Sequence, residues 1–111
     1  MDTQIQTDKI TLYGSLMCPI VPPIYGVLML SDADCIYLDI FRDGHAREVV
    51  RNINNGYESV PTLVFPDGST LTEPGSGQLR RKLEAMGYTV QPPGWQKAMS
   101  AILERLRGQS Q

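Results

Sequence analysis

The sequence lacks the features that define several large classes of proteins. It has only two cysteines, Cys18 and Cys35, among 111 residues, too few for the disulfide framework of a small secreted domain. Its longest apolar stretch, residues 24–30, is far too short to span a lipid bilayer. The first residues contain two acids before the first base and no apolar run, so they are not expected to form a signal peptide. These absences predict a cytoplasmic protein with free thiols.

An excess of positive charge is also lacking. The 10 basic and 12 acidic residues give a formal net charge of −2, and no run of like charges is present. Surfaces that bind nucleic acids or anionic membranes need a basic patch, so neither partner is expected. The single histidine and the absence of metal-ligand spacing predict no metal site. An apolar share of 41% and this length fit one soluble domain.

Alternation, apolar periodicity and turn residues indicate four strands and three helices in the first four fifths of the chain. The predicted strands are 9–13, 35–40, 62–65 and 69–72, and the predicted helices are 24–30, 45–54 and 76–86, the last capped by Ser76. Strands separated by helices pair in parallel, whereas the last two strands, joined by a Pro-Asp-Gly turn, form a hairpin. The order predicts a four-stranded mixed sheet covered by helices.

Three segments resemble glutaredoxins, and most of all the actinobacterial mycoredoxins. They are residues 12–19 (LYGSLMCP), 59–62 (SVPT) and 64–74 (VFPDGSTLTEP). The resemblance covers about residues 9 to 86. It implies a thioredoxin-like α/β fold in three layers, α/β/α, over residues 1–87. Outside the resemblance, residues 88–111 are predicted to form a linker and a C-terminal amphipathic helix over 95–107, on the basis of its apolar stripe.

Within this resemblance, Cys18 occupies the position of the reactive thiol. A cysteine just before a helix faces free backbone N–H groups and the positive end of the helix dipole, and both stabilise a thiolate. Pro19 suits the first helical position, which needs no hydrogen-bond donor. The amides of Ile20 and Val21 are expected to remain available to the sulfur or to a bound thiol.

The sequence departs from the dithiol pattern Cys-x-x-Cys because Val21 stands where the second cysteine is expected. A mixed disulfide on Cys18 must then be released by an outside thiol, such as glutathione or mycothiol, acting as co-substrate without a bound cofactor. The expected substrates are glutathionylated or mycothiolated proteins. Cys35 begins a predicted strand and is expected to be buried. Because Cys-Pro-Ile-Val replaces the Cys-Gly-Phe-Ser of cluster-binding relatives, no iron–sulfur cluster is expected.

A second departure concerns the helix after Cys18. Pro22 and Pro23 have no N–H and disfavour helical angles in the residues before them. The helix is therefore expected to start one turn late, near these prolines, which leaves Cys18 on an extended loop. The missing second cysteine and the proline pair keep open a second function. In this alternative the protein is a non-catalytic module that binds a partner through the Val60–Pro61 face and the C-terminal helix.

The resemblance also implies supporting residues around the thiol. The Val60–Pro61 bond should be cis, so that the backbone of Val60 can pair with an extended substrate. Arg47 and Arg51 are candidates to bind the carboxylates of a small thiol, and so are the N–H groups at Gly75 and Ser76. The apolar stripe of the predicted helix 95–107 is expected to pack on the same domain, with a homodimer contact as the alternative.

Overall fold

The computed structural model describes residues 8–91 and Glu104. Its elements are β1 (Ile10–Gly14), α1 (Val21–Met29), β2 (Cys35–Asp39), α2 (Gly44–Ile53), β3 (Thr62–Val64), β4 (Thr70–Thr72) and α3 (Ser76–Ala85). Each strand and helix predicted up to residue 86 is present, with ends that coincide or differ by at most three residues. The predicted helix 95–107 lies outside the described residues, apart from Glu104.

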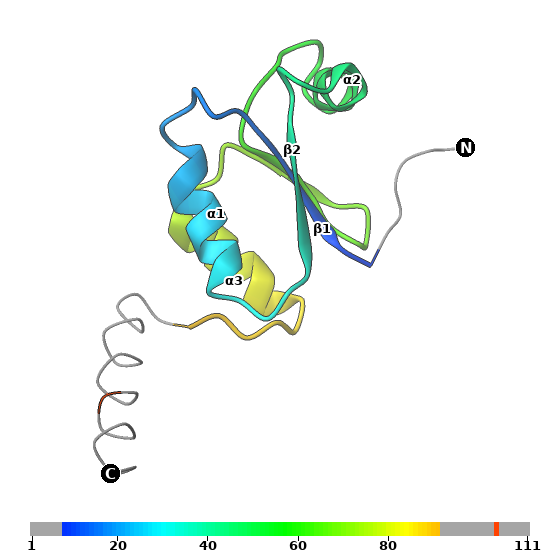
Figure 1. Cartoon of the computed structure of the whole chain (residues 1–111). Coiled ribbons are helices and arrows are strands. Elements are labelled where there is room, and N and C mark those ends of the chain that lie inside the picture. The colour runs from blue at the N-terminus through cyan, green and yellow to red at the C-terminus, as the bar shows by residue number, and fades with distance from the viewer. Residues whose placement is uncertain (1–7, 92–103, 105–111) are drawn as a thin grey trace.

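The strands form one mixed sheet in the order β2-β1-β3-β4, as Figure 1 shows. β1 pairs with β2 in parallel and with β3 antiparallel, and β3 pairs antiparallel with β4. The parallel pair is joined through α1, because parallel strands need a long crossover, whereas a tight turn closes the β3–β4 hairpin. The predicted four-stranded mixed sheet is confirmed.

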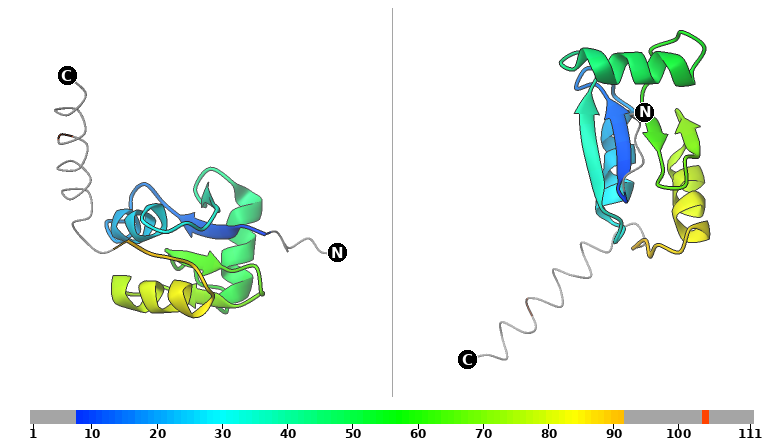
Figure 2. Two further views of the ribbon diagram at one scale, coloured as in Figure 1. Left: turned by 90° about the horizontal axis from the view of Figure 1, so that it is seen from below. Right: turned by 90° about the vertical axis from the view of Figure 1, so that its right-hand side faces the viewer.

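Helices cover both faces of the sheet, so the predicted three-layer arrangement is confirmed. α1 and α3 lie side by side on one face, and α2 crosses the strands on the other (Figures 1 and 2). Alternation along β1 decides which face each side chain meets: Ile10 and Leu12 join the cluster under α1 and α3, and Tyr13 joins the cluster under α2. None of the described helices is long and apolar enough to cross a membrane.

The described chain ends against the domain. Residues 89–91, part of the predicted linker, return to the loop between α1 and β2, where the amide of Asp32 donates to the Thr89 carbonyl at 3.1 Å. Val90 forms an isolated antiparallel bridge with Ser31, and the Gln91 amide donates to the Leu30 carbonyl at 2.9 Å. The segment after α3 is thus fixed at the end of the sheet where β1 begins.

Gly14 ends β1 at the closest contact between β1, β2 and α1. A Cβ atom at this position would lie 2.9 Å from Cε1 of Tyr37 on β2 and 3.0 Å from Cγ1 of Val21 on α1. Side chains in a packed core tolerate no such overlap without moving. The absence of a side chain at residue 14 therefore allows α1 to begin close to the sheet, directly after the turn that carries Cys18.

We expect Gly14→Ala to lower the free energy of unfolding by about 1–3 kcal/mol, because the added methyl group overpacks this contact. Urea denaturation measures the effect. The matched control is Gly26→Ala within α1, where an added Cβ meets no atom within 4 Å. The control should stabilise the protein by about 0.5–1 kcal/mol, because alanine favours the helix more than glycine does. Equal effects of the two substitutions would contradict the packing argument.

Candidate active site

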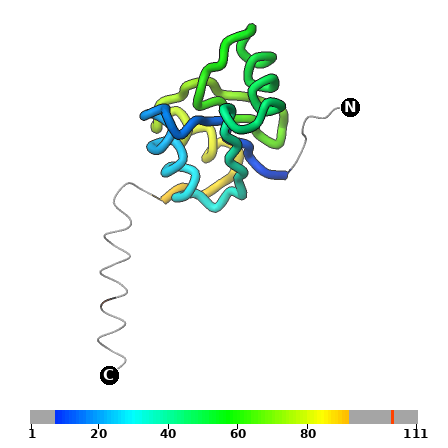
Figure 3. The backbone as a smooth tube through the Cα atoms, turned by 45° about the horizontal axis from the view of Figure 1, so that its top comes forward, coloured from blue at the N-terminus to red at the C-terminus, as the bar shows by residue number. Residues whose placement is uncertain are grey.

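Cys18 lies in a double turn between β1 and α1. The Cys18 amide donates to the Ser15 carbonyl at 3.1 Å, and the Val21 amide donates to the Cys18 carbonyl at 3.3 Å. The Met17 amide donates to the buried Ser15 hydroxyl at 3.0 Å, which secures the first turn. The turn protrudes at the edge of the domain in the backbone tube of Figure 3. Cys18 itself is half-buried, so its thiol remains accessible.

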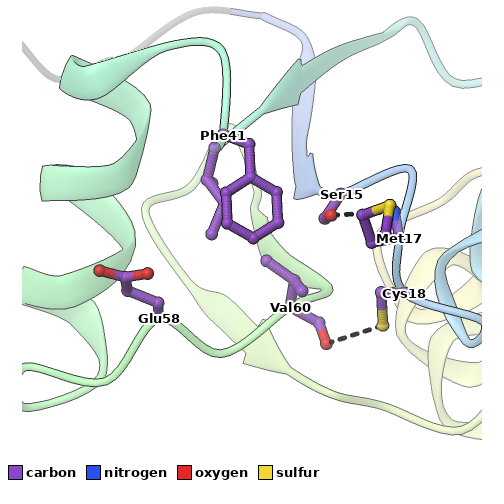
Figure 4. Close-up of a pocket in the computed structure, with 7 residues that line it drawn as sticks. Ser15, Met17, Cys18, Phe41, Glu58 and Val60 are labelled. Atoms are coloured by element: carbon purple, nitrogen blue, oxygen red, sulfur yellow. Dashed lines mark hydrogen bonds between the residues drawn. The ribbon is translucent and has the colours of Figure 1, made fainter.

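The Cys18 thiol points at the loop before β3. Its Sγ donates a hydrogen bond to the Val60 carbonyl across 3.7 Å, although 42 residues separate the two in sequence (Figure 4). The Val60–Pro61 peptide bond is cis, as the resemblance implied. The thiol and the proline loop are therefore neighbours, and Cys18 and Val60 share one site.

The start of α1 offers the sulfur few hydrogen-bond donors. The helix begins at Val21, one turn after Cys18 as expected, and Pro22 and Pro23 follow as its second and third residues. These two residues have no N–H. The expectation that the Val21 amide is available was wrong, because this N–H donates to the Cys18 carbonyl within the turn. Ile20, the N-cap, provides no side-chain cap.

Cys35 lies at the opposite end of the sheet from Cys18. In the β1–β2 register Cys35 faces Ile10, whereas Asp39 faces Gly14, the end of β1 nearest to Cys18. Four residues of strand span about 13 Å, and a disulfide needs Cα atoms within about 7 Å. Cys35 therefore cannot resolve a disulfide on Cys18 within one chain. It is half-buried rather than buried, because β2 is an edge strand. Burial and the nearby Asp34 raise the pKa of its thiol.

The Asp39 carboxylate joins the loop after β1 to the loop after β2. One oxygen accepts the Leu16 amide at 3.4 Å, and the other accepts the Phe41 amide at 2.8 Å. The parallel register of β1 and β2 determines the position of Asp39, because it pairs Asp39 with Gly14 at the end of both strands. The carboxylate thus fixes the position of the Cys18 turn relative to Phe41.

A cavity of about 220 Å³ opens beside the thiol. It is lined by Ser15, Met17, Cys18, Ile40, Phe41, Glu58 and Val60. In Figure 4 Glu58 and Cys18 lie on opposite sides of Val60, with Phe41 above it. Met17 and Phe41 are 81% and 60% exposed, so the rim is apolar and open to a large partner. No group of histidines, cysteines or carboxylates suited to a metal ion occurs among residues 8–91.

Comparison with known proteins agrees with this geometry. Mycoredoxin 1 of Corynebacterium glutamicum is 31% identical over 78 residues, which cover 70% of this chain and 96% of the relative. A Mycobacterium tuberculosis protein provisionally named glutaredoxin Rv3198A is 32% identical over 77 residues, 69% of this chain and 92% of that protein. The chain belongs to the glutaredoxin family.

Solved structures support the fold of this glutaredoxin. A point mutant of the thioredoxin-like protein BC3987 superposes with a TM-score of 0.61 at 23% identity, over 70% of this chain and 97% of that one. The unmutated BC3987 gives a TM-score of 0.51 at 25% identity, over 66% and 97% of the two chains. No family profile matches the chain.

The two candidate arginines of this glutaredoxin already have partners. The Arg47 Nε donates to the Ile40 carbonyl at 3.2 Å, which ties α2 to the end of β2. Arg51 pairs with Glu48 at 3.5 Å and through its Nε with Glu58 at 3.4 Å. Arg51 thus reaches the edge of the cavity only through Glu58. A substrate carboxylate would compete with Glu58 for the Arg51 guanidinium.

Gly75 and Ser76 lie at the start of α3, outside the residues that line the cavity. The predicted cap was wrong: Gly75 is the N-cap in an extended conformation, Ser76 is the first helical residue, and no side chain caps the helix. The preceding loop contacts the proline loop, because the Glu73 amide donates to the Pro61 carbonyl at 2.7 Å. Pro19 and Ile20 lie on the exposed side of the second turn.

The sequence analysis did not identify Asp39, Phe41 and Glu58. A sequence signal exists only for Asp39, an acid at the end of a predicted strand in an otherwise apolar run. Phe41 lies in the loop after β2 and Glu58 in the loop between α2 and β3, and both reach the site only through the arrangement of these loops. No local pattern marks them.

Replacing both helix prolines tests the shortage of donors. We expect Pro22→Ala/Pro23→Ala to accelerate iodoacetamide alkylation of Cys18 at neutral pH several-fold, because two amides return to the first turn and stabilise the thiolate. Peptide mass mapping identifies the modified cysteine. Pro66→Ala, in the β3–β4 turn, is the matched control and should leave the rate unchanged. A rate equal to that of the parent protein in the double variant would refute the argument.

Proposed function

We propose that this glutaredoxin is a monothiol thiol-disulfide oxidoreductase that acts on mixed disulfides between proteins and a low-molecular-weight thiol. The main support is the pairing of the accessible Cys18 thiol with the Val60 carbonyl, beside the cis proline and at the mouth of an open cavity. Thiol–disulfide exchange needs an exposed sulfur with room for a second and a third sulfur in line. The cavity provides that room.

The reaction proceeds in two exchanges. The Cys18 thiolate attacks the small-thiol sulfur of the mixed disulfide, and the protein leaves as a thiolate that takes a proton from water. A second small thiol, as its thiolate, attacks the small-thiol sulfur now bound to Cys18. The products are the reduced protein, the symmetrical small disulfide and the Cys18 thiolate, so each cycle consumes one added small thiol, and the net change is one disulfide exchanged for another. Cys35 takes no part, because it lies about 13 Å of strand away.

The protein part and the small thiol would occupy different parts of the site. An extended cysteinyl segment pairs with the backbone of Val60 as an added strand. The apolar rim of Met17 and Phe41 accommodates side chains of the protein substrate. The start of α3, at Gly75 and Ser76, is left for a carboxylate, if the small thiol carries one.

The charges at the cavity favour a thiol without carboxylates. Glu58 is the charged side chain among the described residues of the lining, and Arg51 is engaged by two glutamates. Glutathione has two carboxylates, whereas mycothiol has none. We therefore favour a mycothiol-type co-substrate over glutathione. This chemistry fits a reducing compartment such as the cytoplasm.

The exposed apolar rim supports a second candidate, a module that binds a partner protein without catalysis. Leu16 and Met17, which precede Cys18 in the turn, are 78% and 81% exposed, and Phe41 is 60% exposed. A homodimer through residues 95–107 stays a prediction, because those residues lie outside the described part of the chain. The cysteine substitutions below separate binding from catalysis.

Cys18→Ser should abolish the reduction of a peptide carrying a mycothiol or glutathione mixed disulfide, a loss of at least about 100-fold, because oxygen cannot replace the sulfur nucleophile. Release of the reduced peptide is followed by chromatography, with excess small thiol present. Cys35→Ser is the matched control and should keep the rate within about twofold, since its sulfur is outside the site. If Cys18→Ser retains the activity, the protein is not a thiol oxidoreductase, and the binding module takes its place.

Val21→Cys should convert the monothiol site into a dithiol site. Residues 18 and 21 close one turn, with the Val21 amide 3.3 Å from the Cys18 carbonyl, so their Cα atoms are near enough for a disulfide. Mild oxidation of the variant should form an intramolecular bond between residues 18 and 21, detected by mass spectrometry as the loss of two hydrogens. The parent protein under the same conditions should form only mixed or intermolecular disulfides. A variant that retains two free thiols there would contradict the turn geometry.

A further inference from the structure

The Tyr37 hydroxyl is a buried polar group without a hydrogen-bond partner among the described residues. A buried hydroxyl that makes no hydrogen bond reduces stability, and phenylalanine would fill the same space without this cost. Unsatisfied groups of this kind in folded proteins call for an explanation, and one explanation is a partner present only in another state of the site. The position of Tyr37 indicates such a partner.

Tyr37 lies under the start of the active-site turn. Its residue in β2 is paired with Leu12, and its ring extends along the sheet until Cε1 is 2.9 Å from the Cβ position of Gly14. The Val21 side chain is 3.0 Å from the same point, so the phenol adjoins the first residue of α1. On its other side the ring meets Tyr25 of α1 edge to face, with ring centroids 6.0 Å apart. The ring thus packs against Gly14, which precedes the Cys18 turn, and against Val21 and Tyr25 of α1.

The charge of an ionised Cys18 also reaches the phenol. Burial raises the pKa of Tyr37, and the negative charges of Asp39 and then of Cys18 raise it further. The phenol therefore keeps its proton at neutral pH and remains a donor when Cys18 is a thiolate. Asp39 itself already accepts the amides of Leu16 and Phe41.

The sulfur needs different neighbours in its two protonation states. As a thiol, Cys18 donates its proton to the Val60 carbonyl. As a thiolate it has no proton to donate, and the carbonyl oxygen repels it. It then needs donors, but Pro22 and Pro23 have none and the Val21 amide is engaged, so the first residues of α1 leave it the Ile20 amide of the N-cap and little else. The Tyr37 O–H is a donor without a partner among the described residues, and its ring contacts Gly14, where the turn starts.

We propose that the Tyr37 hydroxyl donates a hydrogen bond to the Cys18 thiolate and thereby acts as a positioning residue for thiol exchange. The inference rests on the proposed function of Cys18. Ionisation of the thiol releases its proton to water, the bond to the Val60 carbonyl is lost, and the sulfur moves toward the phenol. Tyr37 replaces donors that the proline pair removes from the first turn of α1.

Tyr37→Phe tests the proposal in the full-length protein, because it removes one oxygen and keeps the ring that packs against Gly14 and Tyr25. The rate of Cys18 alkylation by iodoacetamide is measured against pH, with the modified residue identified by mass mapping. Loss of a hydrogen bond to a charged sulfur should reduce the thiolate fraction at neutral pH about tenfold, which moves the midpoint of the profile upward by about one pH unit. Tyr25→Phe, which removes the hydroxyl of the other ring in the pair, should leave the profile in place.

The pH profile separates this inference from the proposed function, because it measures ionisation and not turnover. A profile of Tyr37→Phe that superposes on the parent profile, with an unchanged or higher free energy of unfolding, would overturn the role of Tyr37 and leave the role of Cys18 intact. Retained disulfide reduction in Cys18→Ser would instead remove the proposed function. A shifted midpoint together with normal urea denaturation supports the hydrogen bond, because a merely structural role does not alter the titration of the sulfur.

Discussion

A proline has no amide hydrogen, and three prolines in the five residues after Cys18 limit which groups can face its sulfur. A helix that starts beside a cysteine normally offers free N–H groups in its first turn. Here the helix begins at Val21, its first amide closes a turn onto the Cys18 carbonyl, and the next two residues are proline. The dipole of α1 remains, but most of the hydrogen bonds that usually accompany it are missing. The sulfur therefore depends on groups from other elements.

Those groups come from the sheet. The parallel register of β1 and β2 brings Gly14 beside Asp39, and the bare Gly14 lets Tyr37 and Val21 approach the same point. Asp39 then holds the Cys18 turn and the Phe41 loop by one amide each. The Val60 carbonyl, in the loop before β3, accepts the hydrogen bond of the Cys18 thiol. The site is assembled from the ends of strands, and α1 supplies mainly position and dipole.

The same arrangement separates the two cysteines in the proposed reaction. Cys35 starts β2 at the far end of the sheet, where burial raises the pKa of its thiol and opposes its reaction. An external thiol has access instead, because the cavity beside Cys18 is open and its rim is formed by exposed apolar side chains. Arg51 at the edge is neutralised by Glu48 and Glu58, which makes that cavity a poor site for a carboxylate-rich thiol. The proposed monothiol route and the proposed preference for a thiol without carboxylates thus rest on the same few residues.

The sequence by itself determined the element order and the mixed sheet. These follow from local signals: apolar alternation in β1, the proline pair that delays α1, and the Pro-Asp-Gly turn that folds β3 onto β4. The prolines also predicted the shortage of backbone N–H donors at the start of α1, because the missing N–H is a property of proline itself and not of its surroundings. The resemblance to glutaredoxins added the cis bond before Pro61.

Only the tertiary structure decided what surrounds the sulfur. The Val60 carbonyl that accepts from the Cys18 thiol lies 42 residues away in sequence, so no local pattern encodes this contact. The same is true of the arginines, whose charge is plain in the sequence but whose engagement by Glu48, Glu58 and the Ile40 carbonyl depends on packing. The type of each residue can be read from the sequence, whereas contacts between distant residues form only once the strands have paired in a fixed register.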